Sequence, residues 1–237
     1  MNNAYILHGG GLDSTALLYY VLRLRQHERV VSVNVDYGQR HAKELESAIR
    51  VLQHAVKHFP NTSIQACRVH MPQLQKSESA LTRGEYDVPD VSYAELQGKS
   101  PSYVPNRNMM FISAMQCLAE QECNLEGEES DRCDLFFGAH ADDAAGWAYP
   151  DCTPEFVGAM ANAVYVSSQG KIRLLAPLQH NHKCDNVRLG AAAKAPLDLT
   201  WSCYRGEHLH CGVCPTCRDR KQAFKLAKEL DPTEYAR

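Results

Sequence analysis

Near the start of the chain stands the sequence AYILHGGGLDST, residues 4–15. Residues 4–7 are mostly apolar and predict a short strand, three glycines follow, and residues 14–24 carry Leu and Val at helical spacing. A glycine turn between a strand and a helix lets backbone N–H groups approach an anion, and the helix N-terminus adds partial positive charge. The stretch therefore predicts a phosphate-binding loop. The alternative is a tight turn in which Asp13 or Ser14 only caps the helix.

Further strand-like and helix-like segments alternate along the chain. Residues 30–35, 64–69 and 134–138 are rich in β-branched or apolar residues and predict strands. Residues 41–58 and 111–120 have the spacing of helices. Because strands that alternate with helices form parallel sheets, we expect an α/β fold, a Rossmann-like parallel sheet with helices on both faces.

Two segments depart from this alternation. Residues 77–105 hold three prolines and are too irregular for one helix, so we predict a long functional loop or lid. The composition changes to Cys, His and Gly from residue 195 onward, before residues 218–230 return to a helical pattern. We place a nucleotide-binding and catalytic domain at residues 1–195 and a small metal-binding region, packed on it, at residues 196–237.

Two familiar phosphate-binding loops do not match the glycine turn. A Walker A loop needs Gly-Lys-Ser/Thr, and no lysine precedes Lys43. The dinucleotide fingerprint GxGxxG fits Gly9 and Gly11 only if Ser14 replaces the third glycine. Asp13 would face the phosphates, where an acid is costly unless Mg²⁺ lies between them. A nucleoside triphosphate with Mg²⁺ is therefore favoured over a dinucleotide.

The composition argues against several classes of protein. The 237 residues include 25 Lys+Arg and 28 Asp+Glu, and no basic run that would bind nucleic acid directly. No stretch reaches the roughly 18 apolar residues that span a membrane, and the N-terminus lacks the pattern of a signal peptide. We expect a cytoplasmic protein that binds neither a membrane nor a nucleic-acid polymer.

Four of the ten cysteines lie close together near the end of the chain. Their two CxxC steps, with Gly212 easing the backbone, predict a structural Zn²⁺ held by Cys203, Cys211, Cys214 and Cys217. An iron–sulfur cluster or disulfides are the alternatives. His208 and His210 lie between the ligands and are expected to be exposed loop residues. The six other cysteines are expected to be buried or incidental.

Polar residues follow the predicted loop and strands. Arg107 and Asn108 precede an apolar helix, where they would face an anion or form only a solvated cap. His140, Asp142 and Asp143 follow the strand at the carboxyl end where open α/β sheets bind ligands, although a polar loop is the alternative.

Five more side chains have possible functional or structural roles. Tyr149 and Asp151 could bind a purine-like base, and Tyr149 or Trp147 could stack on it, although a buried packing role for Trp147 is equally consistent with the sequence. Lys183 could neutralise a phosphate charge or be a surface lysine. Cys152 has no neighbouring His in the sequence and is interpreted as structural.

Together these motifs resemble the 7-cyano-7-deazaguanine synthase (QueC) family of the ATP pyrophosphatase (PP-loop) superfamily. GGGLDST is similar to the superfamily's pyrophosphate loop, SGGxDS, and DYGQRH ends the second strand at residues 36–41. The similarity continues in YVPNRN at residues 103–108, in residues 146–152, in Pro177-Leu178 with Lys183, and in SCY at residues 202–204 with the last cysteines. Because these short matches keep their order over nearly the whole chain, the resemblance is specific.

The resemblance implies three sets of site residues. The ATP-binding set comprises His8, Gly9, Gly10, Gly11, Leu12, Asp13, Ser14, Thr15 and Asp36. The substrate-binding set comprises Tyr37, Gln39, Arg107, Asn108, Asp143, Tyr149 and Asp151. The catalytic set comprises Asp13, Ser14, Arg107 and Lys183.

A reaction and a homodimer are also implied by the resemblance. The carboxylate of 7-carboxy-7-deazaguanine would attack the α-phosphate of ATP, giving an acyl adenylate and pyrophosphate. Ammonia would then displace AMP to form an amide. A second adenylation would let the amide oxygen leave as AMP, which yields 7-cyano-7-deazaguanine.

Two residues depart from the family's pattern, and two other functions stay open. Gly9 stands where the family's loop begins with Ser, and Asn106 where it usually has Gly. The first alternative is a QueC-like enzyme of bacterial defence that transfers the activated deazaguanine to an amine such as a protein N-terminus. The second is a nucleotide-binding module whose catalysis has decayed.

Overall fold

A twisted parallel β-sheet forms the centre of the molecule. The computed structural model describes residues 2–24, 26–39, 43–82, 98–123, 132–205 and 208–237. All neighbouring strands pair in parallel, in the order β3-β2-β1-β4-β5. The strands are β1 (Asn2–Leu7), β2 (Arg29–Asp36), β3 (Ser63–His70), β4 (Arg132–Phe136) and β5 (Ile172–Leu175).

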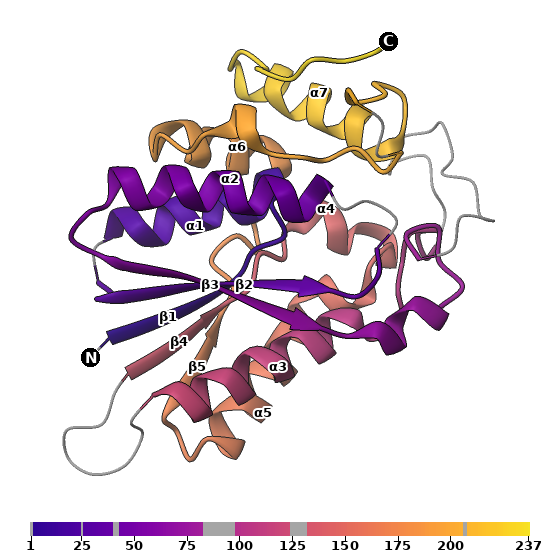
Figure 1. The fold of residues 1–237 in the computed structure, drawn as a ribbon. Coiled ribbons are helices and arrows are strands. Elements are labelled where there is room, and N and C mark those ends of the chain that lie inside the picture. Colours follow the sequence, from indigo (N-terminus) through magenta and orange to yellow (C-terminus); the bar gives the residue numbers. More distant parts are fainter. Residues whose placement is uncertain (1, 25, 40–42, 83–97, 124–131, 206–207) are drawn as a thin grey trace.

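Helices cover both faces of this sheet (Figure 1). One face carries α1 (Leu12–Leu24), α2 (Lys43–His58) and α6 (Lys183–Ala192), and α7 (Pro215–Ala227) lies over α6. The other face carries α3 (Arg107–Glu122) and α5 (Pro154–Ser167). Short helical turns complete the connections: η1 (Pro72–Lys76), α4 (Ala141–Ala144), η3 (Ala145–Trp147), η4 (Pro150–Cys152) and η5 (Leu197–Leu199).

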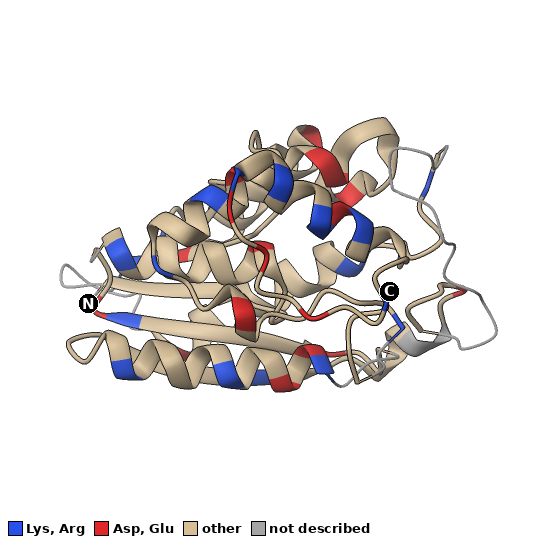
Figure 2. Cartoon of the chain, turned by 90° about the horizontal axis from the view of Figure 1, so that it is seen from above, with Lys and Arg blue, Asp and Glu red and all other residues tan. Residues whose placement is uncertain are grey.

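The expected α/β fold is confirmed, and its layers follow from the burial pattern. Ala4, Tyr5 and Ile6 of the central strand β1 are fully buried, as expected for a strand covered on both faces. In α2 the buried residues recur on one face, including Val51 and Ala55, while charged residues occupy the other face. None of the described helices is long and apolar enough to cross a membrane. Figure 2 shows Lys and Arg interspersed with Asp and Glu over the drawn residues.

Three elements lay outside our sequence-based predictions: α5, β5 and α6. The strand β5 has only four residues, too few for a clear pattern. The helix α5 lacks the contrast between an apolar and a polar face, because its exposed side is built from small or apolar residues that include Gly158, Ala159, Ala163 and Val166. The signal for α6 was its start, where His182 and Asp185 form a reciprocal capping box.

The predicted long loop and the start of one predicted helix are only partly described. Residues 77–82 and 98–106 contain neither helix nor strand, in agreement with the loop prediction. The middle of that loop, residues 83–97, lies outside the described residues, as do residues 41–42 of the predicted helix 41–58.

A buried arginine connects the segments of the C-terminal region to one another. Arg220 of α7 is fully buried; its Nη1 donates to Thr200 Oγ1 at 2.8 Å and its Nη2 to the Leu197 carbonyl at 2.8 Å. Its Nε lies 3.6 Å from Asp231 Oδ1. A buried guanidinium needs such partners because an unpaired buried charge is costly. The predicted boundary between residues 195 and 196 stays a prediction.

The order of the strands determines where a ligand can bind. The chain builds the sheet outward from β1 in one direction, through β2 and β3, and then in the other, through β4 and β5. In open α/β sheets, ligands bind outside the carboxyl ends of the strands at the point where this order reverses. The glycine turn follows β1 and Gly138 follows β4, so both border this crevice.

The glycine turn itself is held close to α2. Gly10 has φ +79°, and a Cβ atom there would lie 2.3 Å from the Glu44 carbonyl oxygen and 2.5 Å from the Ala48 nitrogen. A side chain at Gly9 would meet no atom within 4 Å among the described residues. Gly10 is therefore required by the backbone conformation and by the close packing on α2, whereas neither of these reasons requires glycine at position 9.

We expect the variant Gly10→Ala to lose about 2 kcal/mol or more of its unfolding free energy, because the Cβ atom clashes with backbone and the left-handed φ is strained. Gly9→Ala is the matched control and should change stability little. Urea unfolding followed by circular dichroism measures both. Equal stability of the two variants would contradict the close packing of Gly10 on α2.

Candidate functional site

A cavity opens at the reversal point of the sheet. The following predicted site residues line it: His8, Gly9, Gly11, Asp13, Ser14, Tyr37, Gln39, Arg107, Asn108 and Asp143. They come from the glycine turn, the end of β2, the start of α3 and the segment after β4. Residues far apart in the sequence thus meet at the carboxyl edge of the strands, as predicted for this class of fold.

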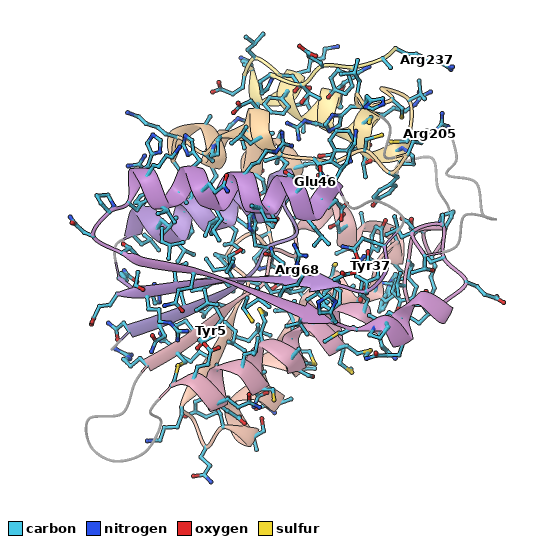
Figure 3. All side chains as sticks on the ribbon, in the orientation of Figure 1. Tyr5, Tyr37, Glu46, Arg68, Arg205 and Arg237 are labelled. Atoms are coloured by element: carbon cyan, nitrogen blue, oxygen red, sulfur yellow. The ribbon has the colours of Figure 1, made fainter. Side chains whose placement is uncertain are left out.

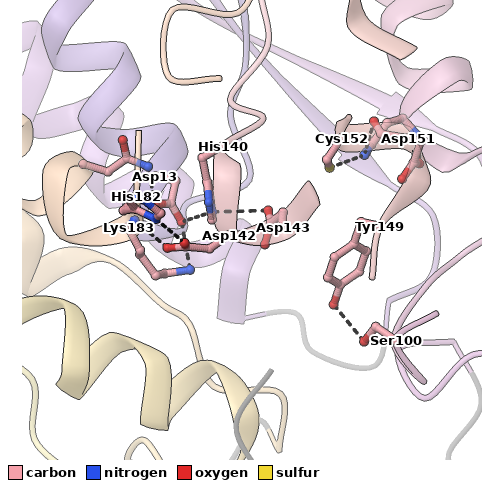
Figure 4. Close-up of polar contacts among 12 residues, drawn as sticks. Asp13, Ser100, His140, Asp142, Asp143, Tyr149, Asp151, Cys152, His182 and Lys183 are labelled. Atoms are coloured by element: carbon pink, nitrogen blue, oxygen red, sulfur yellow. Dashed lines mark hydrogen bonds and ion pairs between the residues drawn. The ribbon is translucent and has the colours of Figure 1, made fainter. Parts of the chain in front are cut away.

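Asp13 is the centre of a charged cluster at the start of α1 (Figure 4). Lys183 Nζ lies 3.1 Å and His140 Nε2 3.6 Å from Asp13 Oδ2. Asn186 Nδ2 donates to Asp13 Oδ1 at 2.9 Å. Burial alone would raise the pKa of Asp13, but Lys183 and then His140 hold that pKa well below its ordinary value. Asp13 is therefore ionised, and side chains of the protein surround its carboxylate. The sequence analysis instead expected Mg²⁺ to balance its charge.

His140 links Asp13 to a second carboxylate. Its Nε2 lies 3.2 Å from Asp143 Oδ2, and its side chain is buried. Burial lowers the pKa of His140, yet Asp143 and Asp13 outweigh that effect and the pKa is raised. Lys183 behaves in the same way, since Asp13 and Asp143 raise its pKa against burial. Two basic and two acidic side chains thus alternate at the edge of the cavity.

The N-terminus of α6 is fixed to the same region by Asp142. Asp142 Oδ2 accepts the Lys183 backbone N–H at 2.7 Å, and Asp142 Oδ1 lies 2.7 Å from His182 Nδ1. These contacts join α4 to α6 and orient the Lys183 side chain toward Asp13. The interpretation of Lys183 as a surface lysine is wrong, because its side chain is mostly buried.

Some residues of the glycine turn face the protein interior. The His8 imidazole is 2.9 Å from Ser32 Oγ and 3.2 Å from Thr15 Oγ1, and burial lowers its pKa to about 4, so it is neutral at pH 7. Leu12 packs in the apolar core shared by α1, α6 and α7. The side chains of His8, Thr15 and Leu12 thus make contacts inside the protein. These three residues can contact a nucleotide only through their backbone groups.

Arg107 enters the cavity from the first turn of α3. Its guanidinium carbon lies 5.9 Å from the ring centroids of both Tyr37 and Phe111, within the range of cation–π contact. The preceding residue, Asn106, has φ 55° in the left-handed region. Asn tolerates that conformation better than most residues with a side chain. The departure from the family's usual Gly therefore keeps the backbone turn that aims Arg107 at the cavity.

Asn108 is held by the segment after α4. Its backbone N–H donates to Asp151 Oδ2 at 3.1 Å, and its Nδ2 lies 3.4 Å from both the Asp151 carbonyl and Cys152 Sγ. Asp151 is buried, which raises its pKa, and it does not line the cavity. The Tyr149 hydroxyl bonds to Ser100 at 3.1 Å and to Ser102. Tyr149 and Asp151 thus support the cavity wall rather than form it.

Of the predicted site residues at the end of β2, Tyr37 and Gln39 line the cavity and Asp36 does not. Gln39 lines it and fixes the turn, accepting the Tyr37 N–H at 3.0 Å and donating to the Val35 carbonyl at 3.3 Å. Asp36 instead faces His70 Nδ1 at 3.4 Å and accepts the Gly38 N–H, and it is not among the residues that line the cavity.

Two further interpretations of single residues were wrong. Trp147 is 62% exposed, which contradicts a buried packing role. His210 is buried rather than an exposed loop residue: its Nε2 accepts the Ser202 N–H at 3.1 Å and its ring lies 4.2 Å from that of Trp201. His208 is exposed, as predicted. Cys152 is buried, and burial raises the pKa of its thiol, in agreement with a structural role.

Glu44 and Tyr204 line the cavity and escaped the sequence analysis. Glu44 lies in the first turn of α2, where an acidic residue ordinarily needs no explanation beyond the helix dipole. Its burial raises its pKa to about 7, although Arg107 acts in the opposite direction. Tyr204 follows Cys203, so the resemblance in SCY was the available signal.

The last four cysteines form a group that can hold a metal ion. Cys203, Cys211, Cys214 and Cys217 are buried, and their sulfur atoms all lie within 4.8 Å of one another. Backbone N–H groups point at the sulfurs, from Cys211 to Cys203 Sγ at 3.3 Å and from Cys214 to Cys211 Sγ at 3.3 Å. Such N–H groups stabilise thiolates, the form of cysteine that binds metals. Gly212 has φ +79°, as the predicted turn requires.

The fold and the site define a class of protein, a parallel α/β protein in which a glycine turn after the first strand borders a cavity at the carboxyl ends of the strands. The family model of the queuosine biosynthesis protein QueC matches residues 3–228. The chain therefore belongs to the QueC family and is an enzyme of the 7-cyano-7-deazaguanine synthase type.

Individual members of this family match the chain over most of their length. The chain is 36% identical to the 7-cyano-7-deazaguanine synthase of Thermoplasma volcanium, over 99% of this chain and 91% of that protein. It is 37% identical to that of Caldicellulosiruptor bescii, over 98% and 96%. A solved structure of the U34-tRNA thiolase NcsA from Methanococcus maripaludis with its [4Fe-4S] cluster is more remote, with 12% identity and a TM-score of 0.45 over 83% of this chain and 57% of that one.

The ion cluster around Asp13 predicts a specific pH dependence of stability. A carboxyl group whose pKa is lowered on folding stabilises the protein above its unfolded pKa of about 4, and this stabilisation is lost as the pH falls below that value. Between about pH 4 and pH 2, the unfolding free energy of the wild type should fall more steeply than that of Asp13→Asn, by up to about 1.4 kcal/mol per pH unit. Urea unfolding at a series of pH values measures both slopes. Equal slopes would show that Asp13 is not ion-paired.

Proposed function

We propose that the protein converts 7-carboxy-7-deazaguanine and ammonia into 7-cyano-7-deazaguanine, using ATP to activate the carboxylate and then the amide. One observation carries the proposal. A single cavity joins a glycine turn at a helix N-terminus, suited to phosphates, with the guanidinium of Arg107, suited to a carboxylate or a phosphate. The match to QueC over residues 3–228 supports the same substrates.

In the first step, the substrate carboxylate attacks the α-phosphorus of ATP and pyrophosphate leaves. The protein's task is to position the two anions and to stabilise the charge that moves onto the pyrophosphate. The N–H groups of Gly11 and Ser14 at the start of α1 are suited to those phosphate oxygens, with Lys183 beside them. Arg107 stabilises and orients the carboxylate through its planar fork. Asp13 then acts as a positioning residue, because it holds Lys183 and His140 in place.

Magnesium is the ion we expect with ATP. Asp13 contacts Lys183 and His140, whereas Asp143 contacts His140 alone, so Asp143 is the better suited of these two carboxylates to hold Mg²⁺ together with phosphate oxygens. The ion would neutralise part of the phosphate charge. The homodimer that the family resemblance implies stays a prediction.

Mass spectrometry of a defined reaction tests the function. The purified protein is incubated with ATP, Mg²⁺, 7-carboxy-7-deazaguanine and ¹⁵N-ammonium, and we expect the labelled nitrile and AMP. The variant Asp13→Ala should release no AMP while it still folds, because Lys183 and His140 lose their partner. An exposed arginine on β3, Arg68 (Figure 3), provides the control variant Arg68→Met, which should keep full activity.

Other products would point to other functions. Amide, or a deazaguanine adduct on a protein amine, without nitrile would favour the transferase of bacterial defence. No AMP under any condition would contradict the proposed synthase and favour a nucleotide-binding module.

We also propose that the four-cysteine group holds a structural Zn²⁺. The sulfur spacing within 4.8 Å suits one tetrahedral ion, whose Zn–S bonds of about 2.3 Å place the sulfurs roughly 4 Å apart. Four protein ligands leave no open position, so the ion would hold the C-terminal region and take no part in the reaction. A cubane iron–sulfur cluster would need the sulfurs to be farther apart.

Metal analysis tests the zinc proposal. We expect about one zinc per chain in the wild type. Cys214→Ser should lose most of the metal and unfold at a lower temperature, because metal binding contributes to folding. Cys117→Ser is the control, since Cys117 is exposed on α3, and it should keep the metal. Iron and sulfide in place of zinc would support the cluster alternative.

A further inference from the structure

We propose that Glu44 is the proton acceptor for the amine half of the reaction, taking the surplus proton from the nitrogen nucleophile. This inference rests on the proposed function and assigns a role to a residue that the adenylation step leaves unused. It follows from the position of Glu44 on the cavity wall, from the groups around it, and from the protons that amide and nitrile formation release.

Glu44 is held in place by the packing of α2 on the glycine turn. A Cβ atom at Gly10 would lie 2.3 Å from the Glu44 carbonyl oxygen. The start of α2 is therefore in direct contact with the glycine turn. Ser47, one turn further, donates its hydroxyl to the Gly10 carbonyl at 2.8 Å. The carboxylate of Glu44 is thereby carried on a rigid element at the edge of the phosphate-binding turn, where the α-phosphate and the acyl carbon must meet.

The groups that face Glu44 come from several elements. Tyr37 follows β2, Arg107 begins α3 and Tyr204 precedes the cysteine group, and all line the same cavity as Glu44. Burial raises the pKa of Tyr37, Arg107 opposes that rise and Glu44 adds to it. Arg107 also acts to lower the pKa of Glu44. No side-chain hydrogen bond or ion pair of Glu44 occurs among the residues that the structure describes, so its carboxylate is available to a ligand there.

The other ionisable groups on the cavity wall are poorly suited to accept a proton at neutral pH. Asp13 is held ionised by Lys183 and His140, and Asp143 is paired with His140. The His8 imidazole is bonded below the turn to Ser32 and Thr15. Glu44 differs because burial raises its pKa to about 7, which is near the value at which a general base is most effective at neutral pH.

The chemistry requires such a group twice. When ammonia attacks the acyl adenylate, a C–N bond forms, the C–O bond to AMP breaks, and AMP leaves with that electron pair. The nitrogen then carries one proton too many, which passes to the Glu44 carboxylate and leaves the neutral amide. Glu44 then returns this proton to water. In the second adenylation the amide oxygen bonds to the α-phosphorus, pyrophosphate leaves, and one N–H proton is lost to water, which gives the neutral imidoyl adenylate. This intermediate gives up its remaining N–H proton to the Glu44 carboxylate. The N–H electron pair becomes the third C–N bond, and AMP departs.

A nearby glutamate on the surface of α2 provides a control variant. Glu46 lies two residues further along α2 and is exposed (Figure 3). The variants Glu44→Gln, Glu44→Asp and Glu46→Gln are compared with the wild type in two assays that share ATP, Mg²⁺ and 7-carboxy-7-deazaguanine. One uses ammonium and measures amide and nitrile. The other uses excess hydroxylamine, which is largely uncharged at neutral pH and traps the acyl adenylate as a hydroxamate. Because hydroxylamine is a weaker base than ammonia, its adduct gives its surplus proton to water without help from the protein, and hydroxamate formation therefore reports the adenylation step.

We expect Glu44→Gln to form hydroxamate at close to the wild-type rate and to lose about 100-fold or more of its ammonium-dependent rate, the range for loss of a general base. Glu44→Asp should recover part of that loss, and Glu46→Gln should match the wild type. The ratio of wild-type to Glu44→Gln rates should rise as the pH rises through about 7, because only ionised Glu44 accepts a proton. Since the ionisation of ammonium is common to all variants, it cancels in that ratio.

Two outcomes would overturn the assignment. Equal loss of hydroxamate and nitrile in Glu44→Gln would mean that Glu44 binds ATP or substrate instead, and an unchanged ammonium-dependent rate would mean that it has no role in proton transfer. A wild-type protein that forms neither hydroxamate nor AMP would instead contradict the proposed function itself. The two failures are therefore distinguishable.

Discussion

The ion pair between Asp13 and Lys183 connects the parts of the chain that form the site. Asp13 opens the helix after β1, Lys183 opens the helix after β5, and His140 joins them from the segment after β4. The three segments leave the sheet at its carboxyl edge, where their backbones diverge. A buried carboxylate such as that of Asp13 is stable there only if its partners are present. The contacts with Lys183 and His140 therefore keep Asp13 ionised and also hold the three segments at a fixed spacing. The cavity is the space that this arrangement leaves on the side of β2 and α3.

The fold was largely predictable from the sequence because its strongest signals are local. The apolar strand before the glycines, the β-branched run of β2 and the two-sided burial of the sheet all leave patterns of a few residues. The family resemblance added the order of the motifs. The unpredicted elements include α5 and β5, where an apolar exposed face and a very short strand remove the contrast on which such patterns depend.

The candidate site was less predictable, because its geometry depends on contacts between distant segments. Asp13, Arg107 and Asn108, which the sequence singles out, line the cavity, but the sequence cannot show that Asp13 faces two basic side chains. Nor can it separate Tyr149, which supports the wall, from Glu44, which lines it. An acidic residue in the first turn of a helix is so common that only the packing of α2 on the glycine turn distinguishes this one.

The same glycine turn also touches the segment that leads to the cysteine group. The Trp201 N–H donates to the Gly10 carbonyl at 3.0 Å, and two residues later the chain reaches Cys203. Lys43, at the start of α2, lies 4.5 Å over the Trp201 ring. A ligand at the turn and a metal on the cysteines would therefore act on one shared stretch of backbone. By thermodynamic linkage, any gain in nucleotide affinity caused by the metal must be matched by an equal gain in metal affinity caused by the nucleotide.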